Sequence, residues 1–267
     1  MTELATGRLR SGRHLGAGRL AGKRTLITGA AGNVGMGLVQ GFLAEGAQVL
    51  AADLAVFNDF EVRPTTGNAD ALLTIRLDVT DPADWNRALA LIISEWGGID
   101  VLVNNAAIAS ALVPIDAREP EDWDQMMAIN LRGPFLGTRA VIPPMRDAGG
   151  GAIVNLSSVA GLAQSRSMDA AYAASKAGLA MLTRVTAAQH GADGIRCNSV
   201  HPGPIDSAMM RAAYPDPEAL AKRLSRVPMS RAASIAEVVA ATIFLASDES
   251  SFTTGTAIGV DGGAIVE

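Results

Sequence analysis

The sequence predicts an open α/β fold in which a parallel β-sheet is covered by helices on both faces. Short, continuous apolar runs recur along the chain and end in polar residues, as expected for strands that are buried on both faces. Amphipathic stretches of helical length separate most of these runs. Aromatic residues make up only 4% of the chain while 28 of its 267 residues are glycine, which suits helices packed closely on a sheet better than a β-sandwich.

Seven apolar runs are the expected strands: 25–28, 49–52, 72–77, 101–103, 152–156, 196–200 and 257–260. Helices are expected after the first strand as far as Gly46, and over 82–97, 120–147, 169–190 and 234–247. Polar residues follow each strand. Ligands of such sheets bind outside the carboxyl ends of the strands, so we expect the functional site at that edge.

The composition excludes several classes of function. A net charge of −5 argues against a nucleic-acid binder, and no apolar run reaches the ~18 residues of a membrane span. The single cysteine, Cys197, cannot form an intrachain disulfide and disfavours a structural zinc site. The three histidines, His14, His190 and His201, have no ligand spacing, so no metal is expected. We expect a cytoplasmic protein that acts on a small molecule.

The chain divides into an N-terminal extension and one domain. Residues 1–22 carry four arginines and one acid without an apolar period, and we expect a mobile extension, with an Arg-rich targeting segment as the alternative. Residues 23–267 form the expected domain. Within it, 204–230 interrupts the alternation of strands and helices and is the expected insertion over the site.

A glycine-rich turn lies between the first expected strand and the first helix. Gly29, Gly32 and Gly35 recur at steps of three, which leaves bare backbone N–H groups at a helix N-terminus for a phosphate. Asp53 lies 18 residues beyond Gly35 at the end of the second strand, where an acid can accept hydrogen bonds from ribose hydroxyls and repel a 2′-phosphate. The alternatives are that the glycines only form a tight turn with close helix packing, and that Asp53 is an ordinary acid at a strand end. We therefore predict a Rossmann-type doubly wound sheet that binds NAD in preference to NADP.

A tyrosine and a lysine share one face of the helix expected over 169–190. Tyr172 and Lys176 are four residues apart, and an ammonium beside a phenol lowers the tyrosine pKa toward working pH. Such a tyrosine can pass a proton to or from a carbinol oxygen. Ser158 ends a strand 14 residues upstream, where its hydroxyl could hold the same oxygen. A tyrosine and a lysine at this spacing are common on helix surfaces, so the pair is significant only in combination with the other motifs.

These motifs occur in an order that resembles one family. They are the glycine turn, Asp78-Val79, Asn104-Asn105-Ala106-Ala107, Asn130, Ser157-Ser158, Tyr172-x-x-x-Lys176, Pro202-Gly203, Thr254-Gly255 and Asp261-Gly262-Gly263. From about residue 20 to 263 the chain resembles the short-chain dehydrogenase/reductase family, in its branch of about 250 residues.

The resemblance implies a catalytic tetrad of Asn130, Ser158, Tyr172 and Lys176. Tyr172 would be the acid/base, and Ser158 would orient the substrate oxygen. Lys176 would bind the nicotinamide ribose and lower the Tyr172 pKa, and Asn130 would hold a water in a proton relay. The reaction implied is hydride transfer between NAD and a secondary alcohol or its ketone, in a homotetramer.

Cofactor contacts are implied at Gly29, Gly32, Asn33, Val34, Gly35, Asp53, Asp78, Val79, Asn104, Ala106, Tyr172, Lys176, Pro202, Gly203, Ile205 and Ser207. Residues 78–79 would flank the adenine, and Asn104 would line the cofactor channel. Residues 202–203 and the backbone near Ile205 would face the nicotinamide carboxamide. Ser207 stands where threonine is common and keeps the hydroxyl.

The sequence departs from the family pattern in three places. Asn33 replaces the middle glycine of the turn, which then reads as in the extended branch of epimerases and dehydratases, although the chain is short for that branch. Ala107 replaces a glycine. The interval from Ser158 to Tyr172 is one residue longer than usual, which leaves Ser157 as an alternative to Ser158. Two other functions stay open: an extended-type epimerase or dehydratase with bound NAD, and a non-catalytic NAD-binding sensor.

Two segments, the loop 164–169 and the insertion 204–230, are expected to border the substrate, and the first of them is mostly polar. The loop 164–169 includes Arg166, and the insertion carries Arg211, Lys222, Arg223 and Arg226 beside Met209 and Met210. A lipid pocket would need apolar side chains in both segments. We therefore expect a small polar substrate such as a sugar, polyol or hydroxy compound, with Arg166 and Met209 as contacts. The alternative is that these side chains only solvate the lid.

Overall fold

The computed structural model describes residues 18–55, 69–110, 112–163, 168–207, 210–211 and 215–266. Its centre is a seven-stranded sheet of order β3-β2-β1-β4-β5-β6-β7, with every neighbouring pair parallel. The strands are β1 (Arg24–Thr28), β2 (Gln48–Asp53), β3 (Leu72–Arg76), β4 (Val101–Asn104), β5 (Gly151–Leu156), β6 (Ile195–Pro202) and β7 (Ala257–Val260). The predicted doubly wound parallel sheet is therefore confirmed.

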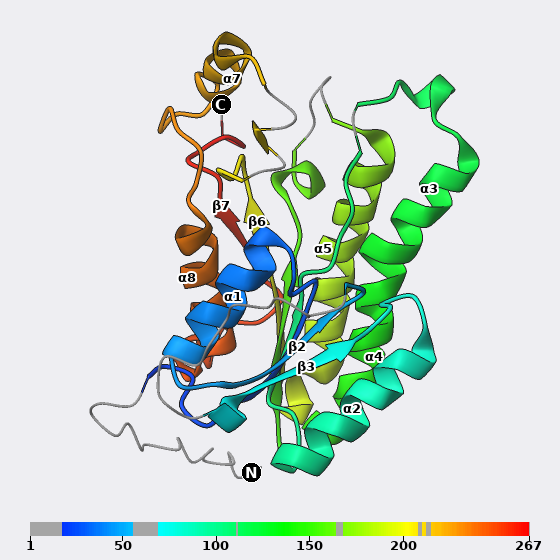
Figure 1. The fold of residues 1–267 in the computed structure, drawn as a ribbon, viewed down its shortest axis with the longest axis vertical. Helices are drawn as coiled ribbons and strands as arrows, with labels where there is room; N and C mark the ends of the chain where they lie inside the picture. Colours follow the sequence, from blue (N-terminus) through cyan, green and yellow to red (C-terminus); the bar gives the residue numbers. More distant parts are fainter. Residues whose placement is uncertain are drawn as a thin grey trace, which may run out of the picture.

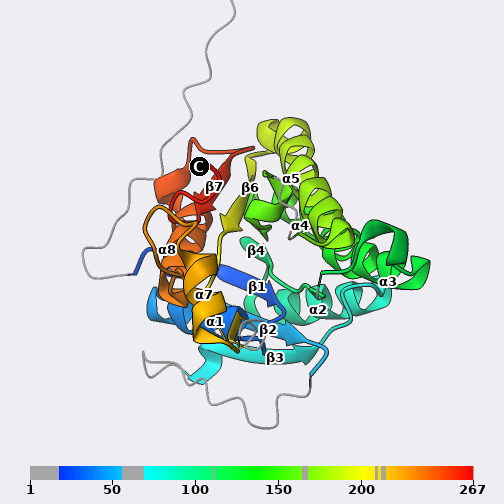
Figure 2. The same ribbon diagram turned by 90° about the horizontal axis from the view of Figure 1, so that it is seen from above.

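Helices cover both faces of this sheet. Those described are α1 (Asn33–Ala44), α2 (Pro82–Trp96), α3 (Pro120–Met127), α4 (Gly133–Asp147), α5 (Ala170–His190), α7 (Pro217–Leu224) and α8 (Ile235–Ala246). Figure 2 shows α1 and α8 on one side of the sheet and α2, α4 and α5 on the other. In Figure 1, α7 lies at the top of the molecule, beyond the carboxyl ends of β6 and β7.

The two faces have separate hydrophobic cores. Phe42 and Leu38 of α1 are fully buried in a cluster that also contains Val239 of α8. On the opposite face, Trp85 of α2 and Val141 of α4 are buried in a second cluster. Because β1, β2 and β4 contribute apolar side chains alternately to both clusters, their sequences read as continuous apolar runs.

The start of the described chain packs against the end of α1. Leu20 is fully buried, and its backbone N–H donates to the Glu45 carbonyl at 3.0 Å. The Arg19 side chain pairs with the Glu45 carboxylate. Residues 18–22, which the sequence analysis placed in the extension, are thus part of the packed structure, while 1–17 lie outside the described residues.

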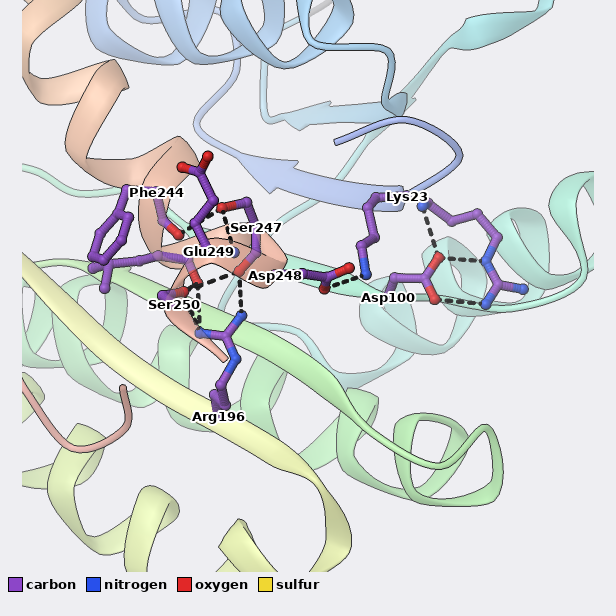
Figure 3. Close-up of polar contacts among 10 residues, drawn as sticks. Lys23, Asp100, Arg196, Phe244, Ser247, Asp248, Glu249 and Ser250 are labelled. Carbon is purple, nitrogen blue, oxygen red and sulfur yellow. Dashed lines mark hydrogen bonds and ion pairs between the residues drawn. The ribbon is translucent and has the colours of Figure 1, made fainter. Parts of the chain in front are cut away.

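Polar contacts tie the amino-terminal edge of the sheet to the end of α8 (Figure 3). Lys23, just before β1, donates to Asp248 at 2.8 Å. Arg196 at the start of β6 donates to the Ser247 carbonyl at 3.0 Å and to the Ser250 hydroxyl at 2.7 Å. A cation that donates to the carbonyls at a helix C-terminus stabilises that end. This edge is therefore closed by structural contacts, opposite the edge where the predicted site residues gather.

The helix expected over 120–147 is interrupted. A π-helical segment, Ala128–Arg132, separates α3 from α4, and the backbone stays in the right-handed helical region throughout. A π segment inserts one extra residue into a turn, which periodicity does not reveal, and such segments often mark functional sites. This one carries Asn130.

Candidate active site

The three glycines of the turn have different structural roles. At Gly29, where φ is +63°, an added Cβ would lie 2.7 Å from the Ala106 Cα. At Gly35 it would collide with the Gly29 carbonyl. At Gly32 it would meet only the Gly29 oxygen, at an ordinary 3.5 Å. The fold itself therefore requires glycine at positions 29 and 35. Glycine at position 32 leaves open the space at the N-terminus of α1, and this space fits a phosphate group.

Two residues that the sequence analysis did not assign hold this turn in place. The Thr28 hydroxyl accepts the backbone N–H groups of Asn105 and Ala106, each at 3.1 Å. The Asn105 side-chain amide donates to the carbonyls of Thr28 and Gly29, each at 3.0 Å. The turn after β1 is thus fastened to the end of β4. Thr28 ends β1 and Asn105 follows β4, and these two strands are neighbours in the sheet. Their polar side chains at strand ends are the sequence signal that could have identified them.

Asp53 faces the turn. It ends β2, and its carboxylate accepts the Ala31 N–H at 2.9 Å and the Ala55 N–H at 3.0 Å. Asn33 is the first residue of α1 and is exposed, and Val34 after it is half-buried. The carboxylate and the helix N-terminus thus lie on the two sides of the same turn.

The next expected cofactor residues lie beyond β3 and β4. Asp78 accepts the Thr80 N–H at 2.8 Å and the Thr80 hydroxyl at 2.7 Å, which closes a turn after β3. Val79 is buried and packs on Gly133. Asn104 is also buried, and its side-chain amide donates to Asn155 at 2.8 Å. The Asn104 side chain is therefore engaged inside the sheet, so a role in the cofactor channel would fall to its backbone.

The residues expected beside the nicotinamide follow β6. The Gly203 N–H, next to Pro202, donates to the Val260 carbonyl at 3.0 Å. Ile205 forms a parallel bridge with Ala233. The Ser207 hydroxyl accepts the Met210 N–H at 3.2 Å. These contacts fix the backbone of residues 203–207 beyond the carboxyl edge of the sheet.

Tyr172, Lys176 and Ser158 meet at the carboxyl edge. Tyr172 and Lys176 lie in α5, and the Lys176 Nζ is 5.7 Å from the centre of the Tyr172 ring. Lys176 donates to the Leu156 carbonyl at 2.8 Å. Burial raises the pKa of Tyr172, and a hydrogen bond with the Ser158 side chain opposes the rise. This direction differs from the lowering predicted from spacing, because spacing does not reveal that the phenol is shielded from water. Burial also lowers the pKa of Lys176 to about 8.

The structure separates the two candidate serines. The Ser157 hydroxyl is buried and donates to the Lys176 carbonyl at 2.9 Å. Ser158 is half-buried, and its hydroxyl accepts the Ala160 N–H at 3.1 Å and lies at the Tyr172 phenol. Ser158 is therefore the serine whose hydroxyl is available beside the phenol.

A buried histidine that the sequence analysis left without a role holds the backbone of Ser158. His201 is fully buried, with Nδ1 2.8 Å from the Ser158 carbonyl and Nε2 2.8 Å from the Ser199 hydroxyl. A carbonyl only accepts, so Nδ1 carries a proton and donates. Burial lowers the pKa of His201, which favours the neutral ring, whose Nε2 then accepts from Ser199.

The two expected substrate contacts are not among the described residues. Arg166 and Met209 lie outside them. Within the described ranges no group of three or more His, Cys, Asp or Glu side chains could hold a metal ion. In the same part of the chain, no helix is both long and apolar enough to cross a membrane.

Known proteins resemble this chain over nearly its whole length. The profile of a family described as enoyl-(acyl carrier protein) reductase matches residues 29–264. The 3-alpha-(or 20-beta)-hydroxysteroid dehydrogenase of Mycobacterium tuberculosis is 39% identical over 250 residues, which cover 93% of this chain and 92% of that protein. The trans-4-hydroxycyclohexanecarboxylate dehydrogenase of Sinomonas cyclohexanicum is 39% identical over 252 residues, which cover 92% and 93%.

Solved structures agree. The crystal structure of gox2181 matches with a TM-score of 0.88 at 32% identity, covering 93% of this chain and 98% of that one. Family profile, relatives and fold point to the same conclusion. The chain belongs to the short-chain dehydrogenase/reductase family, in its branch of about 250 residues, whose members are NAD(P)-linked oxidoreductases.

Proposed function

We propose that this protein interconverts a secondary alcohol and its ketone by hydride transfer with NAD, and that Tyr172 is the acid/base. The observation that carries the proposal is the meeting of the Tyr172 phenol, the Ser158 hydroxyl and the Lys176 ammonium at the carboxyl edge of the sheet. The glycine turn opens at the same edge.

The roles follow from the chemistry of these groups. In the oxidation direction Tyr172, as phenolate, takes the hydroxyl proton of the substrate, and Ser158 donates a hydrogen bond to the substrate oxygen. The charge of Lys176 stabilises the phenolate against the burial that raises the Tyr172 pKa. When bound, the nicotinamide supplies the acceptor or donor of the hydride. Gly32 and the N–H groups that begin α1 would hold the pyrophosphate.

The preference for NAD is part of the proposal. The Asp53 carboxylate lies at the turn, bound to the Ala31 N–H at 2.9 Å. A carboxylate there accepts from the adenosine ribose hydroxyls and repels a 2′-phosphate. No basic residue stands within 28–35 to offset that repulsion.

The substrate we propose is small and polar: a sugar, a polyol or another hydroxy compound. Its support is the mostly polar composition of loop 164–169 and the basic side chains that the insertion 204–230 carries. The names of the relatives include both a steroid and a hydroxycarboxylate as substrates. The choice between these classes therefore needs a direct measurement.

A substrate panel tests the proposal. Purified protein is incubated with NAD, or separately with NADP, and with polyols, sugars, hydroxy acids, steroids and long-chain alcohols, and absorbance at 340 nm is followed. We expect net NADH formation with a polar alcohol. Best turnover of steroids or long-chain alcohols would contradict the polar substrate. Conversion of a sugar without net NADH would favour the epimerase or dehydratase, and NADH binding without any turnover would favour the sensor.

The proposed assembly is a homotetramer, and the proposed location is the cytoplasm. Exposed apolar side chains on α4 and α5, including Phe135, Met181 and Val185, suit a self-complementary interface. Light scattering at micromolar concentration measures the assembly, and a monomer would contradict it.

A further inference from the structure

A buried ion pair lies beside the candidate active site. Arg118, in the segment between β4 and α3, pairs with Asp169, the residue before α5. Their side chains are only 6% and 4% exposed. The Arg118 guanidinium also donates to the Ser110 hydroxyl at 2.9 Å and lies 3.5 Å from the Asp122 carboxylate.

Asp169 has a second contact that leads directly to the site. Its Oδ1 accepts the backbone N–H of Tyr172 at 3.0 Å, and so caps α5, while its Oδ2 is bound by Arg118. A capping carboxylate fixes the first turn of a helix, and Tyr172 lies in that first turn. The rotamer of Asp169 is therefore held by Arg118, and the Tyr172 backbone is held by Asp169.

The segment that carries Arg118 is itself fixed at its other end. The N–H and carbonyl of Ile108 both pair with the Asn130 side chain, at 2.9 and 2.8 Å. The segment after β4 is thus held at Ile108 by the π segment and tied at Arg118 to the N-terminus of α5. The link from this segment to α5 is made by two side chains, Arg118 and Asp169, neither of which belongs to the tetrad.

We propose that Arg118 and Asp169 form a positioning pair, which sets the place of the Tyr172 phenol relative to Ser158. The proposal rests on the proposed function in taking Tyr172 as the acid/base. A displacement of about 1 Å in a reacting group can lower turnover about 100-fold, so a pair that only orients Tyr172 can still govern rate. The contrasting possibility is that the pair serves fold stability alone.

Charge-neutral variants separate these possibilities. Arg118→Met removes the guanidinium, and Asp169→Asn keeps an oxygen to cap α5. The double variant carries both changes and leaves no buried unpaired charge, so it is the variant expected to fold best. The matched control is Arg24→Met with Asp100→Asn, which removes the ion pair at the opposite edge of the sheet, where Arg24 Nε lies 2.7 Å from the Asp100 carboxylate.

Two readouts are measured on each protein. The first is steady-state kinetics with thermal unfolding alongside. In the Arg118/Asp169 double variant we expect kcat to fall about tenfold to 100-fold, the KM for NAD to stay within about twofold, and the double variant to be no slower than the slower single variant. The control double variant is expected to lose thermal stability with its kcat unchanged.

The second readout does not depend on activity. The chain has two tyrosines, so protein labelled with 3-fluorotyrosine gives two ¹⁹F resonances, and Tyr172→Phe identifies the one from Tyr172. We expect this resonance to shift or broaden in the Arg118/Asp169 double variant and not in the control. If the resonance and kcat match the control, or kcat falls without any change in the resonance, the positioning role is overturned. If no substrate is turned over by the unaltered protein, the proposed function fails, and the resonance still decides whether the pair positions Tyr172.

Discussion

Asn130 and Ile108 form a closed pair of hydrogen bonds. The Asn130 Nδ2 donates to the Ile108 carbonyl at 2.8 Å, and its Oδ1 accepts the Ile108 N–H at 2.9 Å. Asn130 is fully buried in the π segment, and Ile108 lies in the segment after β4. The pair therefore couples the middle of the α3–α4 helix to a loop that borders the site.

Asn130→Ala is expected to lower both stability and turnover. The substitution leaves the N–H and carbonyl of Ile108 without these partners, at a cost of about 2 kcal/mol or more in the free energy of unfolding. Urea unfolding measures this cost, and steady-state assays measure kcat. Asn86→Ala, at an exposed position of α2, is the control and should change stability by less than about 0.5 kcal/mol. Equal effects of the two substitutions would contradict the role of the pair.

Gly32→Ala is expected to weaken cofactor binding without unfolding the protein. The Gly32 backbone, with φ −74° and ψ 163°, is open to alanine, and the new Cβ meets only the Gly29 oxygen at 3.5 Å. The methyl group would occupy the space proposed for the phosphate, so we expect the Kd for NADH to rise about tenfold while the melting temperature stays within a few degrees. NADH fluorescence titration and thermal unfolding check the two parts.

Gly35→Ala is the comparison for that experiment. Its Cβ would collide with the Gly29 carbonyl, so we expect a large loss of stability. Unchanged NADH affinity in Gly32→Ala would mean that the phosphate does not lie at this glycine.

Asp53→Asn is expected to narrow the preference for NAD over NADP. The amide keeps an oxygen for the Ala31 N–H but removes the negative charge. Repulsion of the 2′-phosphate then disappears, and kcat/KM for NADP should rise relative to NAD by about tenfold or more. Initial rates with both cofactors give the ratio. Equal efficiency of NAD and NADP in the unaltered protein would show that Asp53 does not contact the ribose.

Tyr172→Phe is expected to remove catalysis and spare binding. It deletes one hydroxyl, and acid–base catalysis by such a group contributes at least about 100-fold to kcat. NADH binding, measured by fluorescence, should persist. Turnover close to that of the unaltered protein would rule out Tyr172 as the acid/base.

Lys176→Met is expected to stabilise the protein at neutral pH while lowering its activity. Burial lowers the Lys176 pKa from 10.5 in the unfolded chain to about 8. At pH values between about 8 and 10.5, Lys176 keeps its proton in the unfolded chain and has lost it in the folded chain. The free energy of unfolding therefore rises with pH across this range. At pH 7 both states are charged, and the buried charge costs about 3 kcal/mol.

The methionine variant avoids that cost and loses a hydrogen bond to Leu156 worth about 1 kcal/mol. Relative to the unaltered protein, we expect the free energy of unfolding of this variant to be about 2 kcal/mol higher at pH 7, and the difference to disappear toward pH 10.5. Urea unfolding at pH 7, 8.5 and 10 measures it. Lys222→Met, at an exposed position of α7, serves as the control. A gain that does not depend on pH would contradict the burial of a charged Lys176.

The sequence by itself determined the sheet, the glycine turn and the edge where the polar residues gather. Burial on both faces forces parallel strands to be continuous apolar runs, and parallel strands place all their carboxyl ends at one edge. Gly29 and Asp53 could therefore be placed at one turn, and Ser158 with Tyr172 at one site, without any knowledge of contacts.

Only the tertiary structure decided which neighbours each of these side chains meets. Ser157 and Ser158 are adjacent in the chain, yet one hydroxyl is bound to the Lys176 carbonyl and the other lies at the Tyr172 phenol. The raised pKa of Tyr172 depends on the burial of its phenol in the folded chain. The Arg118–Asp169 pair likewise joins residues 51 positions apart. Periodicity reports which face of an element is buried, whereas hydrogen bonds and pKa values depend on distances between elements, which the packing of the whole chain sets.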